Sequence, residues 1–287
     1  MAHSSVFSEN PGKRAAERWY LIYTPIWGAA AGLVMTTGLG VRWSQQPSGD
    51  LAFLLFGVGI WLGVLLGGYA FRAPEDAGRP WWHLYHTKLQ IWMFVFAFLG
   101  NYFTQYFYEV LHLEYGFGTK WNLNQVPLFL YFLTVAYFST YGTLINLSRR
   151  FLSSRLPRSA PGWLRAATFL PACFAVACLE TALNANPFMK SLFCYDDLGL
   201  VLTFGTFVYG LWFVVTAPLW FPIDEARGVD TPLRDVWLGA LAGFMLVIIV
   251  NESIRNWVAP YFTTVQRGAI GLGRFGESCL APKPPLR

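Results

Sequence analysis

The chain has 287 residues, of which 55% are hydrophobic, 18% aromatic and only 13% charged, and its formal net charge is +5. A typical soluble domain has about 25% charged residues, so this composition argues against a disordered chain and against a soluble enzyme. The basic residues lie mainly between apolar segments, where they suit anionic lipid headgroups. The sequence has no basic patch that would indicate nucleic-acid binding, so the expected surroundings are a lipid bilayer.

Seven segments are apolar and long enough to be candidates for crossing a membrane. About 20 apolar residues of helix span the hydrocarbon core, and backbone groups in that core must be satisfied within the protein. The alternation with period two that is typical of barrel strands is absent. The sequence therefore predicts an all-α, polytopic membrane helix bundle of about seven transmembrane helices, over residues 19–41, 51–71, 89–108, 121–148, 166–189, 198–223 and 236–251.

The distribution of Lys and Arg predicts the orientation of this bundle. Thirteen of them lie in the N-terminal segment and the connections on its side, against three in the connections on the opposite side. Because cytoplasmic loops carry the excess of Lys and Arg, the N-terminus is predicted to be cytoplasmic. We expect a cytoplasmic segment over 1–18, a transmembrane helical domain over 19–257 and a C-terminal tail over 258–287.

One carboxyl group lies well inside a predicted span. Glu180 is about two-thirds of the way along 166–189, and no Lys or Arg of that span is close enough to pair with it. Ionisable residues in a bilayer are costly and are candidates for function. Apolar surroundings disfavour the carboxylate and leave a neutral acid that could donate a proton. Asn184 follows at i+4, on the same helix face. The competing interpretation is a structural Glu that hydrogen-bonds a neighbouring helix.

The third predicted span carries a polar stripe. Asn101, Gln105 and Glu109 recur at i, i+4 and i+8, and His112 follows. Such a stripe can be a proton relay or a set of hydrogen bonds between helices, and both interpretations stay open. Asn101 lies deepest in the span and is the better candidate for lining a pocket.

Two acidic residues end the sixth predicted span on the cytoplasmic side. Asp224 and Glu225 can be a solvated helix end, and Lys88, which opens the third span on the same side, could pair with them. Metal and nucleotide motifs are weak: the chain has four histidines, and the pair His83 and His86 would alone make a poor metal site. We therefore expect no metal ion and no cofactor.

Several short blocks keep their order and approximate spacing from residue 10 to about 255. They are NPGKR (10–14), YTPIW (23–27), GNYF (100–103), WNLNQVP (121–127), FLT (132–134), LET (179–181), AN (185–186), Pro218 and DE (224–225). Together these blocks resemble those of the cycloeucalenol cycloisomerases, the cyclopropylsterol isomerases of phytosterol synthesis. Plant members have histidines near Gln105 and in the fourth span, whereas this chain has none in the fourth span, which favours Glu180 as the acid.

The resemblance implies a membrane enzyme that opens the 9β,19-cyclopropane ring of a cycloeucalenol-type sterol. An acid protonates C19, and loss of the C8 proton then gives the Δ8 sterol obtusifoliol without redox chemistry or a cofactor. On this hypothesis Glu180 is the proton donor, and Asn101 and Tyr102 orient it or the sterol. Asp224 or Glu225 would anchor the 3-hydroxyl, and aromatic faces would stabilise the cation. The expected substrate-binding residues are Asp224, Glu225, Gln105, Asn184 and Trp92.

Two other functions stay open at this point. A sterol double-bond isomerase also needs a proton donor in an apolar pocket. A sterol-binding or transport protein would need no catalytic acid, although the inverted repeat that would favour a transporter is not visible. The expected location is the endoplasmic reticulum if the source is eukaryotic and the inner membrane if it is bacterial.

Overall fold

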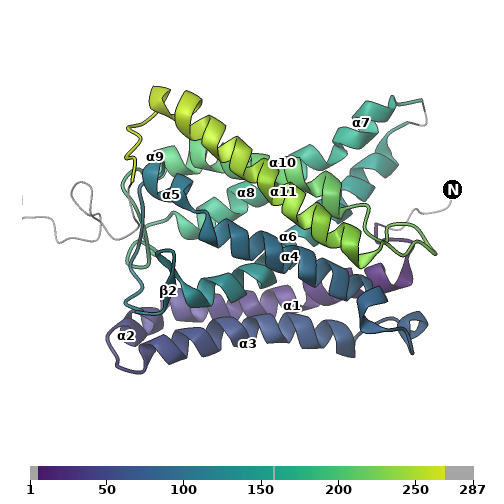
Figure 1. Cartoon of the computed structure of the whole chain (residues 1–287), viewed down its shortest axis with the longest axis horizontal. Helices are drawn as coiled ribbons and strands as arrows, with labels where there is room; N and C mark the ends of the chain where they lie inside the picture. Colours follow the sequence, from purple (N-terminus) through teal and green to yellow (C-terminus); the bar gives the residue numbers. More distant parts are fainter. Residues whose placement is uncertain (1–5, 158, 269–287) are drawn as a thin grey trace, which may run out of the picture.

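The computed structural model describes residues 6–157 and 159–268. In this part of the chain seven helices have 15 residues or more and lie side by side, with successive ones running in alternating directions (Figure 1). The expected all-α bundle is therefore confirmed. The long helices are α1 (Pro11–Thr36), α3 (Gly49–Ala70), α4 (Tyr85–Tyr102), α6 (Leu128–Arg155), α8 (Leu170–Asn184), α10 (Thr206–Trp220) and α11 (Leu233–Ser253).

Short elements connect these helices. Two antiparallel pairs of strands lie among them: Leu113 of β1 pairs with Tyr195 of β4, and Leu123 of β2 pairs with Val126 of β3. The strands are β1 (Leu113–Tyr115), β2 (Asn122–Leu123), β3 (Val126–Pro127) and β4 (Phe193–Tyr195). The short helices are α2 (Leu39–Ser44), η1 (Pro74–Asp76), η2 (Trp81–His83), α5 (Gln105–Glu109), α7 (Gly162–Ala166), η3 (Ala167–Phe169), α9 (Leu198–Leu200), the π-helical η4 (Val201–Gly205) and η5 (Ile254–Val258), and η6 (Ala259–Tyr261).

Five helical segments of the described chain are long and apolar enough to cross a membrane, and they identify an integral membrane protein. About seven crossings were expected, and five candidate spans are found within the described residues, because α1 and α4 are not among them. The five segments are Gly49–Ala70, Leu128–Arg155, Gly162–Asn184, Leu198–Trp220 and Leu233–Tyr261.

Two predicted boundaries were wrong for local reasons. Residues 121–127 form the β2–β3 hairpin instead of the start of a span, with Asn124 and Gln125 both at positive φ, as the tight turn of a hairpin requires. The predicted third span breaks after Tyr102, where α4 ends, and α5 begins as a separate short helix at Gln105. The polar stripe of the third span is therefore not on one continuous helix face.

Helix α6 is the central helix of the bundle. It packs against α1, α3, α4 and α8, and 78% of its apolar window is buried inside the protein, against 28–39% for the other four candidate spans. Side chains on one face of α6 therefore point into the protein rather than toward lipid. The functional site is built on this face.

The predicted C-terminal tail begins by packing against the rest of the protein. The backbone N–H of Gln266 donates to the Glu109 carbonyl at 2.8 Å, and the N–H of Gly268 donates to the Glu109 side chain at 2.8 Å. Residues 269–287 of that tail lie outside the described part of the chain.

Candidate active site

A cavity of about 550 Å³ lies between α1, α6, α8 and α10, and is closed at one end by residues around β1 and β4. Its volume is in the range of small-molecule sites, about 300–1,000 Å³. Most of its lining is aliphatic or aromatic, with a few hydroxyl and amide groups. A cavity of this kind can enclose a large apolar ligand that has few polar groups.

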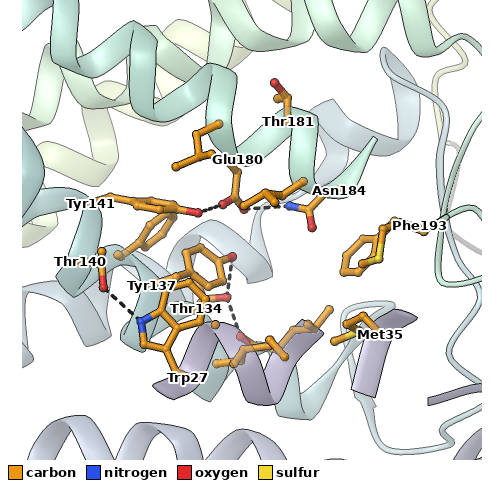
Figure 2. A pocket seen from close by; sticks show the side chains of 18 of the residues that line it. Trp27, Met35, Thr134, Tyr137, Thr140, Tyr141, Glu180, Thr181, Asn184 and Phe193 are labelled. Carbon is orange, nitrogen blue, oxygen red and sulfur yellow. Dashed lines mark hydrogen bonds between the residues drawn. The ribbon is translucent and has the colours of Figure 1, made fainter. Parts of the chain in front are cut away.

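Glu180 of α8 points into this cavity and is held by two donors (Figure 2). The Tyr141 hydroxyl of α6 donates to one carboxyl oxygen, and Asn184 Nδ2 donates to the other at 3.0 Å. Among the described residues that line the cavity, Glu180 is the one with a carboxyl group, and none is Lys, Arg or His. Asn184, expected on the same helix face as Glu180, is hydrogen-bonded to it, and the described lining has no basic side chain that could form an ion pair with Glu180.

The end of α8 places this carboxyl near the helix C-terminus. Asn186 donates to the carbonyls of Ala182 and Leu183 at 3.1 and 2.7 Å, and its side-chain oxygen accepts from the backbone N–H groups of Phe188 and Met189. These bonds satisfy carbonyls that the helix end leaves free. Pro187 follows directly and cannot continue the helix.

A second set of polar side chains lies on α6 and α4. Two of its members, Thr134 and Tyr137, are seen below Glu180 in Figure 2. Asn101 Nδ2 donates to Thr134 Oγ1 at 2.9 Å and to the Ala97 carbonyl at 2.8 Å. The Tyr137 hydroxyl donates to Thr134 Oγ1 at 3.1 Å, and Thr134 donates to the Leu130 carbonyl at 2.5 Å. Asn101 thus lines the same cavity as Glu180, as expected.

A third set of polar side chains connects α1 to α6 by hydrogen bonds. Trp27 Nε1 donates to Thr140 Oγ1 at 3.2 Å (Figure 2), and the hydroxyls of Thr24 and Thr140 lie 2.9 Å apart. Sequence reasoning missed Thr134, Tyr137, Thr140 and Tyr141, although their spacing repeats about every three or four residues. This repeat puts hydroxyl groups on one side of an otherwise apolar helix, and that was the available signal.

The cavity is open on one side, between α1 and α8. Both helices pack against α6, and residues of each helix that line the cavity are also exposed: Pro25 and Ala29 on α1, and Leu179 and Leu183 on α8. These exposed apolar residues show where the lining of the cavity reaches the surface of the protein.

Three predicted site residues do not line the cavity. Tyr102 is 37% exposed at the end of α4, and its ring contacts that of Phe103. Gln105 is half-buried at the start of α5, beyond the break that the sequence did not reveal. Trp92 is fully buried against Trp220, with ring centroids 5.2 Å apart, and packs inside the bundle. The structure therefore does not bring these three residues to Glu180.

Asp224 and Glu225 also lie away from the cavity, in a cluster of ion pairs. Lys88 Nζ lies 2.7 Å from Asp224 and also pairs with Asp230. Arg150 binds both Glu17 and Glu225, and Lys13 pairs with Glu225 at 2.8 Å. We call these seven residues the ion-pair cluster: Lys13, Glu17, Lys88, Arg150, Asp224, Glu225 and Asp230.

The position of Lys13 shows how far this cluster is from the cavity. Thr24, the first residue of α1 in the lining, lies eleven residues further along the helix, a rise of about 16 Å. The carboxyl groups of Asp224 and Glu225 form ion pairs with basic side chains of the cluster. The structure therefore does not support the expectation that they anchor a sterol hydroxyl.

The ion-pair cluster predicts a loss of stability in acid. Burial acts to raise the pKa of Glu225, but the hydrogen bonds of Arg150 and the charge of Lys13 outweigh it and hold this pKa below its ordinary value. A carboxyl whose pKa is lowered in the folded state stabilises the protein above its unfolded pKa, about 4.3 for Glu, and this contribution is lost as the pH falls through the folded pKa.

We expect the unfolding temperature in detergent to be steady from neutral pH to about pH 5, and to fall below that. Glu225→Gln should weaken this acid dependence. An equally steep fall in the variant and in the parent protein would show that Glu225 does not contribute to it.

The described residues contain no group of three or more His, Cys, Asp or Glu side chains that could hold a metal ion. The site therefore consists of one carboxyl with two hydrogen-bond donors, together with hydroxyl and amide groups in an aromatic cavity. Such a site can move a proton to or from an apolar molecule.

Comparison with known proteins identifies the family. No family model and no solved structure matches the chain. The chain is 31% identical over 257 residues to the cycloeucalenol cycloisomerase of Arabidopsis thaliana, and the match covers 88% of each protein. At this identity and coverage, the chain belongs to the cycloeucalenol cycloisomerase family and is an isomerase.

Proposed function

We propose that this protein opens the 9β,19-cyclopropane ring of a cycloeucalenol-type sterol and forms a Δ8 sterol, obtusifoliol in the case of cycloeucalenol. One observation carries the proposal: an apolar, aromatic cavity, whose lining reaches the protein surface on α1 and α8, holds a single carboxyl group among its described lining residues. The name of the Arabidopsis relative agrees with this chemistry.

The reaction begins with proton transfer from the Glu180 carboxyl to C19. The C9–C19 bond breaks, C19 becomes a methyl group on C10, and positive charge develops at C9. A base then removes the C8 proton, and the electrons of that C–H bond form the C8–C9 double bond. Because one proton is added and one is lost, the carboxylate that Glu180 leaves after the first step is the candidate for this base.

The surroundings of Glu180 suit both halves of this cycle. An apolar cavity favours the neutral carboxyl over an unpaired anion, which keeps the acid protonated before the sterol reacts. Once the proton has left, Tyr141 and Asn184 donate to the two carboxylate oxygens, and hydrogen bonds to a charged group are stronger than neutral ones. The aromatic rings of Tyr137, Phe138 and Trp212 line the same space and can stabilise the cation.

The first experiment is turnover in deuterated water. Membranes containing the protein are incubated with cycloeucalenol, and the sterols are analysed by mass spectrometry. Obtusifoliol with deuterium in the C19 methyl group is expected. If the folded protein binds the sterol but leaves the ring intact, it is a sterol-binding protein. If it moves only the double bond of a sterol without a cyclopropane ring, it is a double-bond isomerase.

Tyr141→Phe tests the support of the carboxylate. The variant removes one hydrogen bond to a group that becomes charged, which is worth about 1.5–3 kcal/mol. We therefore expect kcat to fall about 10- to 100-fold, with KM nearly unchanged. Tyr69→Phe is the matched control, because its hydroxyl bonds Thr87 outside the cavity. A higher KM with an unchanged kcat would show that Tyr141 binds the sterol instead.

We further propose that α1 and α4 also cross the membrane, which gives seven crossings with a cytoplasmic N-terminus. The connections rich in Lys and Arg gather at the end of the bundle where α1 begins (Figure 1), as expected for a cytoplasmic face. The membrane would be the endoplasmic reticulum in a eukaryote or the inner membrane in a bacterium.

A further inference from the structure

The sterol of the proposed reaction carries one hydroxyl group, at C3, which needs a polar partner in an otherwise apolar site. Burying a hydroxyl without a hydrogen bond costs several kcal/mol in an apolar medium. Asp224 and Glu225 belong to the ion-pair cluster and do not line the cavity. The partner must therefore be one of the hydroxyl or amide groups of the lining.

Most of these groups already use their hydrogens within the protein. Thr134 donates to the Leu130 carbonyl, Thr36 donates to the Gly32 carbonyl, and Tyr141 donates to Glu180. The hydroxyl of Thr140 accepts from Trp27 and lies within hydrogen-bond distance of Thr24. These contacts hold the helices together and leave little capacity for a ligand.

Two amide oxygens of the lining, those of Asn101 and Asn184, accept no hydrogen bond from any residue that the structure describes, but the Asn184 amide is bonded to Glu180 itself. The amide that is separate from the proton donor is that of Asn101. Both hydrogens of Nδ2 are used, one by the Ala97 carbonyl and one by Thr134 Oγ1. Asn101 is only 9% exposed, yet it lines the cavity. An acceptor that faces the cavity without a protein donor can accept a hydrogen bond from a ligand, and a bound ligand that covers it without donating leaves it unsatisfied at a cost of about 1–3 kcal/mol.

The orientation of this amide is fixed by its partners. A carbonyl such as that of Ala97 can only accept a hydrogen bond, so the nitrogen must face it. Exchanging the amide oxygen and nitrogen would place two acceptors against each other. Oδ1 is therefore the amide atom left for the cavity.

We propose that Asn101 Oδ1 accepts a hydrogen bond from the 3-hydroxyl of the sterol and so anchors the substrate beside Glu180. This inference rests on the proposed function and names the group that recognises the substrate. Asn101 is a positioning residue: it fixes where the ring system lies, and Glu180 supplies the proton. A sterol without a hydrogen to donate at C3 is then a poor substrate.

The test compares cycloeucalenol with its 3-O-methyl ether, which has the oxygen but cannot donate. We expect the wild-type kcat/KM to be about 10- to 100-fold higher for the alcohol, since a donor is lost against a buried acceptor. In Asn101→Leu, which is similar in size and has no acceptor, the ratio should fall close to one. Gln105→Leu, at the first residue of α5 and outside the lining, should keep the wild-type ratio.

A second variant keeps the proposal testable if Asn101→Leu does not fold. Thr134→Val removes one of the two acceptors that orient the amide and should lower the ratio partly. A wild-type ratio near one, or an unchanged ratio in either variant, would overturn the anchor while leaving the isomerase function intact. Failure of the wild-type protein to convert cycloeucalenol would overturn the proposed function itself.

Discussion

Replacing Glu180 with Gln is expected to lower kcat by about 10²- to 10⁴-fold, the range that a positioned general acid contributes. Gln has nearly the same shape and can still bond Tyr141 and Asn184, but it has no acidic proton to give to C19. Because the change leaves the apolar lining intact, sterol binding should persist. The measurement is product formation in deuterated water at equal amounts of folded protein.

The matched control for this variant is Glu252→Gln. Glu252 lies on α11, is exposed and does not line the cavity, so the same chemical change there should leave turnover within about twofold of the parent. If Glu180→Gln forms product at the full rate, Glu180 is not the donor. The search would then move to Glu109, which is buried beside Arg255 outside the cavity.

The sequence was sufficient to predict the bundle and the carboxyl at its centre. A long apolar segment in a membrane is predicted to be helical without knowledge of the segments that pack against it, because its backbone groups find hydrogen-bond partners only within the protein. Glu180 stood out for a related reason, since a lone acid in such a run is costly. Its contact with Asn184 follows from helix geometry alone.

What the sequence could not reveal depends on contacts between distant segments. Gly100 lies in the last turn of α4, but no Gly or Pro follows Tyr102 before Gln105, so a single helix was expected and Gln105 was placed on the same face as Asn101. The contact of Tyr141 with Glu180 joins residues 39 apart in the chain, and the pairing of Lys88 with Asp224 joins residues 136 apart. Such pairings follow from how the helices pack, which spacing along one helix does not determine.

Asp224 is held in a buried ion pair with Lys88, which argues against its expected role as a substrate anchor. Its side chain is 3% exposed, and its oxygens lie 2.7 and 3.0 Å from Lys88 Nζ, while one of them also accepts from the Thr231 N–H at 2.6 Å. Removing one partner of a buried ion pair leaves an uncompensated charge and typically costs about 3–5 kcal/mol. Asp230 is more exposed and can stay solvated.

Lys88→Met is therefore expected to lower the free energy of unfolding by about 3–5 kcal/mol, measured by thermal unfolding in detergent. KM and kcat of the folded fraction should stay near the parent values, because the ion-pair cluster lies away from the cavity. Lys190→Met, at an exposed lysine, should change stability by less than about 0.5 kcal/mol. If Asp224→Asn instead raised KM without loss of stability, Asp224 would bind the sterol directly. In that case the Asp224 carboxylate would set the affinity for the substrate and would not be only a structural partner of Lys88. The ion-pair cluster would then belong to the active site.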